Sequence, residues 1–237
     1  MSAPVSVVVP TYQAAAQIGP TLADLADGVL AGVVRDLVIA DGGSSDAVAE
    51  VADAAGARLI VAPRGRGSQL AAGCAAARGD WLLVVHADTR LAPGWAEAVA
   101  RHLCDAPGAA GYFALRFDDE SVAARLVAGW ANLRARLFAL PYGDQGLLLP
   151  RTLYDAAGGY AAIPLMEDVS LVRAIVRTGG RRALRPLASV ATTSAERYRR
   201  EGWLRRGARN LAILVRWRLG AALTHRPRSQ PPWMRSA

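Results

Sequence analysis

Short apolar runs alternate with longer stretches of mixed polarity along the first half of the chain. The apolar runs are four or five residues long and rich in Val, Leu and Ile, which is typical of strands buried on both faces. We predict strands at residues 5–9, 36–40, 57–61 and 82–85, and helices at 17–29, 46–55, 68–77 and 94–105. This alternation predicts an α/β fold with a mainly parallel sheet and helices on both faces.

The second half of the chain has a less regular pattern. In chain order we predict an antiparallel strand at 109–117, a helix at 122–140, a loop at 141–146, and a loop leading into a helix at 165–178. The helix at 122–140 has apolar residues three or four apart, at Leu126, Trp130, Leu133 and Leu137. No internal repeat, low-complexity tract or domain linker is evident in the sequence.

Length and composition set the class of protein. The chain has 237 residues, of which 52% are hydrophobic and 20% charged, enough for one sizeable core. Its two cysteines, Cys74 and Cys104, form no C-x-x-C pair, which fits a reducing compartment and argues against a zinc ribbon. The first residues lack a basic segment, and no apolar stretch reaches the roughly 18 residues of a membrane span. We therefore expect a cytoplasmic protein.

The net charge of +8 is unevenly distributed. All 28 basic residues are arginines; residues 1–172 hold 12 of them with 18 acids, whereas residues 173–237 hold 16 with 2 acids. Two interpretations fit this asymmetry: a soluble tail that reflects Arg-rich codon usage, or a C-terminal part that contacts the phosphate of a nucleotide, a lipid headgroup or a nucleic acid. We divide the chain into a catalytic domain at 1–200 and an Arg-rich helix and tail at 201–237.

A basic amphipathic helix is predicted at residues 203–223. Its apolar positions are three or four apart, at Leu204, Ala208, Leu211, Val215, Leu219 and Ala222, and arginines lie off that stripe. Two interpretations remain open. The stripe packs on the catalytic domain, or the helix rests on an anionic membrane surface with Trp203 and Trp217 at the interface. The second interpretation would place the protein at the inner face of the membrane.

Polar residues follow three of the predicted strands. Pro10-Thr11-Tyr12 follows the first strand and Asp41-Gly42-Gly43-Ser44 the second, while His86 and Asp88 follow the fourth. The carboxyl ends of parallel strands are where ligands bind in open α/β sheets. A carboxylate at Asp41 suits a base or ribose, and His86 with Asp88 suits a divalent cation or a phosphate-bearing ligand. The alternatives are capped turns at both places, with Ser44 or Ser45 as helix cap.

Further candidate site residues lie before the third predicted helix and in the second half of the chain. Arg66 stands in a glycine-rich R-G-R-G at a helix N-terminus, which favours an anion but is a weak signal. Asp144 and Gln145 lie in the predicted loop, and Glu167 and Asp168 begin the next helix. A carboxylate here suits a general base, whereas the alternative for Glu167 and Asp168 is to complement a helix dipole.

Together these motifs resemble those of a known family. The order V-S-V-V-V-P-T-Y, D-G-G-S-S-D, H-A-D-T, G-D-Q-G and E-D-V is similar to that of family-2 glycosyltransferases of the GT-A fold, over roughly residues 4–200. The last three motifs resemble most a small bacterial subgroup labelled arsenosugar-biosynthesis-type, or radical-SAM-associated. The resemblance implies inverting, non-processive sugar transfer from a nucleoside-diphosphate sugar, with a UDP-sugar favoured, to an acceptor hydroxyl that the sequence does not identify.

The resemblance also implies roles for individual residues. Asp168 would be the catalytic base and Glu167 its neighbour, while Asp88, with His86, would hold Mn²⁺ or Mg²⁺ on the donor diphosphate. The remaining candidates would contact the donor or the acceptor: Pro10, Thr11, Tyr12, Asp41, Ser44, Arg66, Asp144 and Gln145.

Two features depart from the family pattern. Gln13-Ala14 replaces the usual Asn-Glu after the first strand, and His86 replaces the first acid of D-x-D. Because imidazole suits Mn²⁺ or Zn²⁺ better than Mg²⁺, the departure at His86 leaves the metal open. The processive Q-x-x-R-W motif is absent, and Arg197-Tyr198-Arg199-Arg200 stands near its usual place.

Two functions from other classes compete with this interpretation. A sugar-nucleotide nucleotidyltransferase would share the architecture, but it would have a glycine-rich basic loop directly after the first strand, where P-T-Y-Q-A stands. A non-catalytic module that binds anions, membranes or nucleic acid would explain the Arg-rich C-terminal part. It would leave the ordered acids unexplained, so a nucleic-acid partner is not expected.

Overall fold

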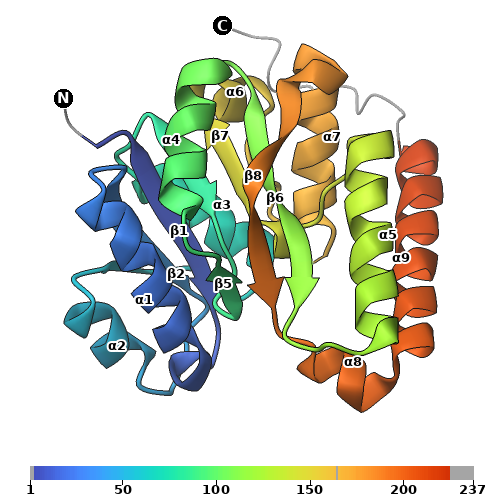
Figure 1. The fold of residues 1–237 in the computed structure, drawn as a ribbon, viewed down its shortest axis with the longest axis horizontal. Helices are drawn as coiled ribbons and strands as arrows, with labels where there is room; N and C mark the ends of the chain where they lie inside the picture. Colours follow the sequence, from blue (N-terminus) through green and yellow to red (C-terminus); the bar gives the residue numbers. More distant parts are fainter. Residues whose placement is uncertain (1–2, 164, 225–237) are drawn as a thin grey trace, which may run out of the picture.

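The computed structural model describes residues 3–163 and 165–224 (Figure 1). Its strands are β1 (Val5–Thr11), β2 (Val34–Asp41), β3 (Arg58–Val61), β4 (Trp81–Val84), β5 (Thr89–Leu91), β6 (Ala110–Phe117), β7 (Leu147–Pro150) and β8 (Leu184–Thr193). Its α-helices are α1 (Ala15–Leu30), α2 (Val48–Ala54), α3 (Arg66–Ala76), α4 (Trp95–Asp105), α5 (Val122–Phe138), α6 (Arg151–Ala156), α7 (Glu167–Gly179), α8 (Glu196–Glu201) and α9 (Trp203–Thr224). Short 3₁₀ helices are η1 (Gly143–Gln145) and η2 (Arg181–Ala183).

The strands form a single mixed sheet in the order β3-β2-β1-β4-β7-β6-β8-β5. The first four are parallel to one another, as the alternation of strands and helices predicts. β7 runs antiparallel to β4 and β6, and β8 pairs parallel with β6 and antiparallel with β5. The sequence predicted an antiparallel strand at 109–117; β6 is antiparallel to one neighbour and parallel to the other.

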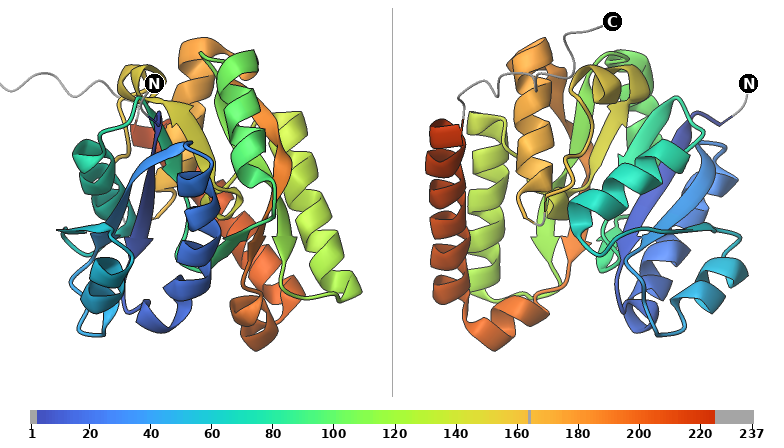
Figure 2. Two further views of the ribbon diagram at one scale, coloured as in Figure 1. Left: turned by 60° about the vertical axis from the view of Figure 1, so that its left-hand side comes forward. Right: turned by 180° about the vertical axis from the view of Figure 1, so that it is seen from behind.

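Helices cover both faces of the sheet, which explains the continuous apolar runs (Figures 1 and 2). In β1, Val5, Val7 and Val9 face a cluster with α1 and α4, while Val8 faces a cluster with α3 and α7. Because successive side chains of a strand point to opposite faces, most residues of such a strand are apolar. Ser6 is a polar exception in β1; it is buried, and its hydroxyl accepts from the backbone N–H groups of Arg78 and Gly79. The predicted α/β fold is confirmed.

Helix α5 packs on the sheet through small residues. Ala124, Ala128, Ala131 and Ala135 are buried, and the first three form a third cluster with Leu115 and Phe117. Val127 packs partly buried against this cluster, whereas the other large apolar residues of α5 are exposed. The helical spacing at 122–140 therefore predicts the helix correctly, although its large residues do not build the core.

Helix α9 runs beside α5 (Figures 1 and 2). The predicted C-terminal helix is present, and Trp203 packs against Phe117 and Tyr198. Of the predicted apolar stripe only Ala208 has a described side chain, and it is exposed; Leu204, Leu211, Val215, Leu219 and Ala222 lie outside the described side chains, as does Trp217. The division of the chain at residue 200 stays a prediction. None of the described helices combines the length and apolarity that a bilayer crossing requires.

Substitution of two helical glycines, one tightly packed and one in open space, should change the free energy of unfolding in opposite directions. A Cβ at Gly73 of α3 would lie 2.5 Å from Val8 Cγ1, whereas a Cβ at Gly129 of α5 would meet nothing within 4 Å. Gly73→Ala should lower the free energy of unfolding by about 1–3 kcal/mol through overpacking. Gly129→Ala should raise it by about 0.5–1 kcal/mol, because alanine is the better helix former.

Urea denaturation of both variants measures this pair of effects. Equal stabilisation by the two substitutions would contradict the close packing of α3 on β1.

Candidate active site

The carboxyl ends of β1, β2 and β4 lie at one edge of the sheet. The parallel register sets Thr11 beside Asp41, and Val8 beside Val84 two residues before His86. A cleft of about 540 Å³ opens at this edge, between the first half of the chain and the segments that contain η1, α7, α8 and α9. Nine predicted site residues line it: Pro10, Thr11, Tyr12, Arg66, His86, Asp88, Asp144, Glu167 and Asp168.

Asp41 and Ser44 are close to the cleft but do not line it. The Asp41 carboxylate accepts hydrogen bonds from Thr11 Oγ1 (2.9 Å), from the backbone N–H groups of Gly43 and Ser44, and from Ser44 Oγ. Burial alone would raise the pKa of Asp41, but these hydrogen bonds outweigh it and lower the pKa below its usual value. In this structure Asp41 and Ser44 hold the loop after β2, so direct contact with a base stays a prediction.

Gln69 is a residue of the site that the sequence analysis missed. It is buried on α3, its amide donates to the backbone oxygens of Thr11 and Ala40, and its Oε1 accepts from Gly65 N–H (3.4 Å). It thereby ties the ends of β1 and β2 to the loop before α3. The sequence feature that could have revealed this role is the position of Gln69 as a polar residue on the apolar face of the helix predicted at 68–77.

Two arginines flank the loop before α3. The Arg64 guanidinium stacks over the Tyr12 ring, 4.0 Å from its centroid, at the rim of the cleft. Arg66 Nε lies 3.6 Å from Glu167 Oε1, across the cleft wall. Burial and the neighbouring Asp168 raise the pKa of Glu167, and Glu167 is almost fully buried. Glu167 therefore forms an ion pair with Arg66 at the beginning of α7.

His86 and Asp88 both line the cleft directly after β4. Burial, with Arg66 and Arg197 as neighbouring cations, holds the pKa of His86 well below its usual value. The imidazole is therefore neutral near pH 7 and has a lone pair available for a cation. Within the described residues no group of three or more His, Cys, Asp or Glu side chains is arranged to hold a metal ion.

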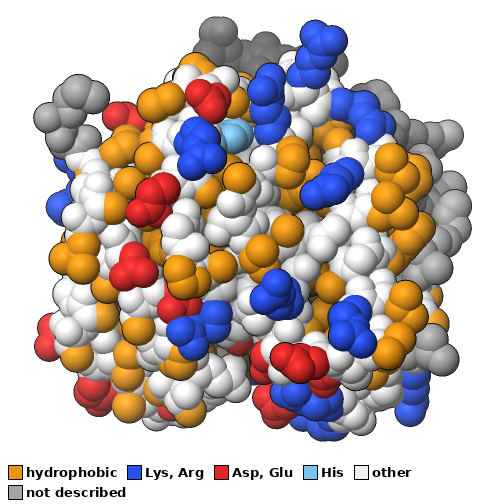
Figure 3. Space-filling model, in the orientation of Figure 1, with side chains coloured by type: hydrophobic (Ala, Val, Ile, Leu, Met, Phe, Trp, Pro, Cys, Tyr) orange, Lys and Arg blue, Asp and Glu red, His pale blue; other side chains and the backbone are white. Residues whose placement is uncertain are grey.

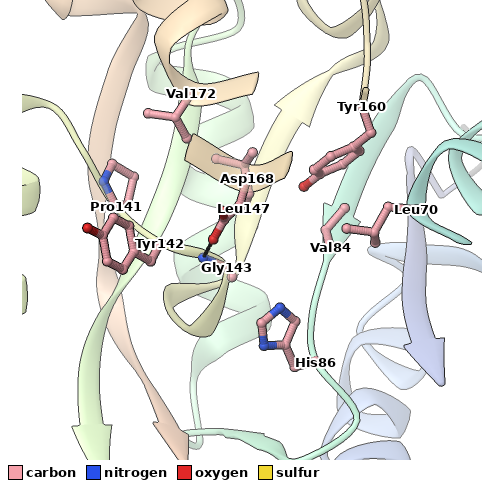
Figure 4. Close-up of a pocket in the computed structure, with 11 residues that line it drawn as sticks. Leu70, Val84, His86, Pro141, Tyr142, Gly143, Leu147, Tyr160, Asp168 and Val172 are labelled. Atoms are coloured by element: carbon pink, nitrogen blue, oxygen red, sulfur yellow. Dashed lines mark hydrogen bonds between the residues drawn. The ribbon is translucent and has the colours of Figure 1, made fainter. Parts of the chain in front are cut away.

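Asp168 and His86 converge on Gly143 (Figure 4). The Gly143 backbone N–H donates to Asp168 Oδ2 at 2.5 Å, and Asp168 Oδ1 accepts from Val169 N–H at 2.7 Å. A Cβ at Gly143 would lie 2.7 Å from His86 Nε2 and 3.1 Å from Asp168 Oδ2. The three groups thus meet within a few ångströms, and only glycine fits between them.

Asp144 brings a second carboxylate to the cleft. Burial raises the pKa of Asp144 to about 6, and Asp168 and Asp88 add to the rise while Arg134 opposes it. Its Oδ1 atom is buried without a hydrogen-bond partner. A hydroxyl of a ligand in the cleft would satisfy that atom.

The structure contradicts the prediction that Gln145 contacts the donor or the acceptor. Its side chain is fully buried, donates to the Phe113 carbonyl oxygen at 3.1 Å and lies 3.4 Å from Asn132 Oδ1. It does not line the cleft. The polar G-D-Q-G loop looked like a set of ligand contacts, but Gln145 satisfies a backbone carbonyl of β6 and so supports the loop from behind.

The far wall of the cleft comes from the C-terminal part of the chain. Arg197 and Tyr198 of α8 line the cleft, together with Arg206, Asn210 and Ile213 of α9. Asn210 donates to the Tyr198 hydroxyl at 3.2 Å, and Arg206 pairs with Glu201 at 2.8 Å. This face of α9 was not predicted from the sequence, because polar residues three or four apart are typical of a solvated helix face.

Comparison with known proteins identifies the family. The profile described as Glycosyl transferase family 2 matches residues 6–164, which is more than half of the chain. The chain belongs to this glycosyltransferase family. The match runs from β1 through α6 and the segment that follows α6, and it ends just before Glu167 and Asp168. The chain is therefore an enzyme of the glycosyltransferase class. The search of the curated proteins found no match.

Solved structures of one glycosyltransferase share the GT-A fold of this chain. The glucosyl-3-phosphoglycerate synthase of Mycobacterium tuberculosis, in complex with Mn²⁺, UDP and glucosyl-3-phosphoglycerate, has a TM-score of 0.59 and 21% identity, covering 81% of this chain and 70% of that chain. Its complex with Mg²⁺ and UDP has a TM-score of 0.60 and 20% identity, covering 81% and 69%. Its complex with Mn²⁺, UDP-glucose and phosphoglyceric acid has a TM-score of 0.60 and 22% identity, covering 81% and 70%.

The hydrogen bonds to Asp41 give a prediction for stability. Asp41→Ala should lower the free energy of unfolding by about 1–3 kcal/mol, because buried donors lose their acceptor. The folded-state pKa is lowered, so the contribution of the carboxylate is present above the ordinary value of 3.8 and is lost as pH falls toward the folded-state pKa. The loss on substitution should therefore be larger at pH 6 than at pH 3.

Urea denaturation at the two pH values measures this effect. Asp53→Ala, on the exposed surface of α2, is the matched control and should change little. A loss for Asp41→Ala that is the same at both pH values would contradict the role of the ionised carboxylate.

Proposed function

We propose that this glycosyltransferase carries out an inverting, single transfer of a sugar from a UDP-sugar to an acceptor hydroxyl. The observation that carries the proposal is the convergence of Asp168, His86 and Gly143 in a cleft at the carboxyl ends of β1, β2 and β4. This is where ligands bind in open α/β sheets. The bound UDP and UDP-glucose of the structural neighbours support the choice of donor.

Asp168 is the proposed general base. Its carboxylate lines the cleft, and the Gly143 N–H fixes one of its oxygens. The acceptor hydroxyl gives its proton to Asp168 while its oxygen attacks the anomeric carbon, and the bond from that carbon to the diphosphate oxygen breaks. The configuration of the anomeric carbon is inverted by this single displacement. Asp144, with an unpartnered buried oxygen, would bind a hydroxyl of the sugar or the acceptor.

A divalent cation, Mn²⁺ or Mg²⁺, fits the donor set at His86 and Asp88. A neutral imidazole and a carboxylate are suitable ligands, and the described residues offer no complete cluster of protein ligands. The diphosphate of the donor would then supply further oxygens. When bound, such a cation neutralises charge on the leaving nucleoside diphosphate. The Mn²⁺ and Mg²⁺ in the neighbouring structures support this assignment.

The nucleotide would lie along Pro10, Thr11 and Tyr12, near the Arg64 guanidinium that covers the Tyr12 ring. Asp41 would act on the base directly or through the Thr11 hydroxyl that it holds. The acceptor would lie toward the wall formed by α8 and α9. Membership of the arsenosugar-type subgroup is part of this proposal and rests on the H-A-D-T, G-D-Q-G and M-E-D-V motifs.

A cytoplasmic location with peripheral contact to a membrane is also part of the proposal. The exposed arginines Arg205, Arg209 and Arg216 of α9 support an anionic surface as partner. The cleft wall occupies another side of the same helix, through Arg206, Asn210 and Ile213. The proposed contact therefore has to leave that side of α9 free.

The first prediction from this proposal concerns turnover. Asp168→Asn should lower kcat by about 10²- to 10⁴-fold, because the amide cannot take the acceptor proton. Affinity for UDP should change little, and the Gly143 N–H can still bond to the amide oxygen. Release of UDP from a UDP-sugar, measured in a coupled assay, gives kcat.

The matched control is Asp155→Asn, an exposed carboxylate of α6 outside the cleft, which should keep normal turnover. Full turnover of Asp168→Asn, with turnover lost in Asp144→Asn, would instead assign the base to Asp144.

The second prediction concerns the metal. Asp88→Ala should weaken UDP binding and remove its dependence on Mn²⁺, because one cation links the carboxylate to the diphosphate. His86→Asp should shift the preference toward Mg²⁺, since carboxylate oxygen suits Mg²⁺ better than imidazole does. Calorimetry of UDP binding with Mn²⁺, with Mg²⁺ and after EDTA treatment measures both changes.

Full activity of the parent enzyme after EDTA treatment would show that the reaction needs no metal. An unchanged metal preference in His86→Asp would remove His86 from the metal site.

A further inference from the structure

Helix α5 presents its large apolar side chains to the outside. The exposed fractions are 64% for Val122, 69% for Leu126, 57% for Trp130, 46% for Leu133, 53% for Leu137 and 60% for Phe138. These six residues, the α5 face, are more than half of the eleven large hydrophobic side chains that are exposed in the described chain. Single exposed apolar residues are ordinary, but a contiguous set on one helix marks an interaction surface.

The packing of α5 on the sheet does not need this face. The alanines at 124, 128, 131 and 135 already bury the opposite side of the helix. In this helix the small residues face the core and the large residues face outward. The large apolar side chains would therefore gain favourable free energy if another surface removed them from water.

The charges around the α5 face indicate an anionic partner. Neither α5 nor the neighbouring α9 contains an acidic residue, whereas α5 has three arginines and α9 has five, of which Arg206 lines the cleft and Arg206 and Arg209 pair with Glu201. Arg125 and Arg136 are exposed beside the apolar side chains, and Arg181 donates to the Leu137 carbonyl oxygen at the end of the helix. In Figure 3 hydrophobic side chains run down the right-hand side over α5, with arginines beside them.

We propose that the α5 face docks on an anionic lipid bilayer. Leu, Phe and Trp side chains enter the headgroup region, and the flanking arginines contact the anionic headgroups. Trp130 lies in the middle of the helix and suits the bilayer interface. A second copy of this chain fits less well, because a two-fold contact through α5 would set arginines against arginines.

This inference deepens the proposed membrane contact of α9 and is independent of the sugar-transfer chemistry. It assigns the contact to α5, which leaves the cleft side of α9 free. Because α9 contacts α5 and also lines the cleft, docking holds one wall of the cleft close to the lipid headgroups. An acceptor carried by a lipid would reach the cleft from that side.

Co-sedimentation with vesicles tests the proposal on the intact chain. The protein should bind vesicles of phosphatidylcholine with phosphatidylglycerol at low salt, and bind pure phosphatidylcholine far less. The double substitution Leu126→Ser with Leu133→Ser should weaken binding to the anionic vesicles by about tenfold or more, since two apolar side chains are lost from the contact. Arg125→Gln with Arg136→Gln should reduce both the binding and its salt dependence.

The matched control uses exposed apolar residues elsewhere. Val29 and Leu30, at the end of α1, are 58% and 86% exposed, and Val29→Ser with Leu30→Ser should leave vesicle binding unchanged. Circular dichroism and calorimetric UDP binding on the same samples verify the fold. They also separate the two proposals, because a protein that binds vesicles but not UDP overturns only the proposed donor.

Three outcomes would overturn the docking proposal. The first is absence of binding of the intact chain to anionic vesicles at low salt. The second is an equal loss of binding in the control variant. The third is a lipid-free dimer in sedimentation velocity that the Leu126 and Leu133 substitutions dissociate, which would assign the α5 face to a second copy of the chain.

Discussion

The hydrogen bond from the Gly143 backbone N–H to Asp168 joins η1 to α7 on one side of the cleft, next to His86. Gly143 begins η1, Asp168 lies in the first turn of α7, and His86 follows β4, so three distant parts of the chain meet at one point. A methyl group at Gly143 would occupy the space that His86 and Asp168 share. The absence of a side chain at one residue therefore sets how closely the imidazole and the carboxylate approach each other.

Buried hydrogen bonds of three other side chains fix the loops around Gly143, His86 and Asp168 at the end of the sheet. Asp41 and Gln69 hold the loops after β2 and before α3, and Gln145 fixes η1 to β6 from behind. All three side chains are buried and make their contacts with the protein itself. Such fully satisfied polar groups act as rigid supports, and the groups left for a ligand are those that face the cleft. Asp144, with one unpartnered oxygen, is one of the groups that face the cleft.

Much of the fold was predictable because its signal is local. Continuous apolar runs in β1, β2 and β4 require cover on both faces, and the helices between them follow from the same alternation. The position of β8 beside β6 was not predictable, since strand pairing across the chain has no local signal. The strand-end residues Thr11, His86 and Asp88 reach the cleft because parallel strands end at one edge. The inner face of α9 and the buried role of Gln145 depend on tertiary packing, which residue type alone does not reveal.

The central claim is a single displacement with Asp168 as base in a glycosyltransferase that uses a UDP-sugar. The most direct test needs no acceptor other than water, and it follows the slow hydrolysis of UDP-glucose by proton NMR. The account predicts that the first glucose released is the β-anomer, inverted relative to the α-linked donor, before mutarotation mixes the two. Release of the α-anomer first would contradict it.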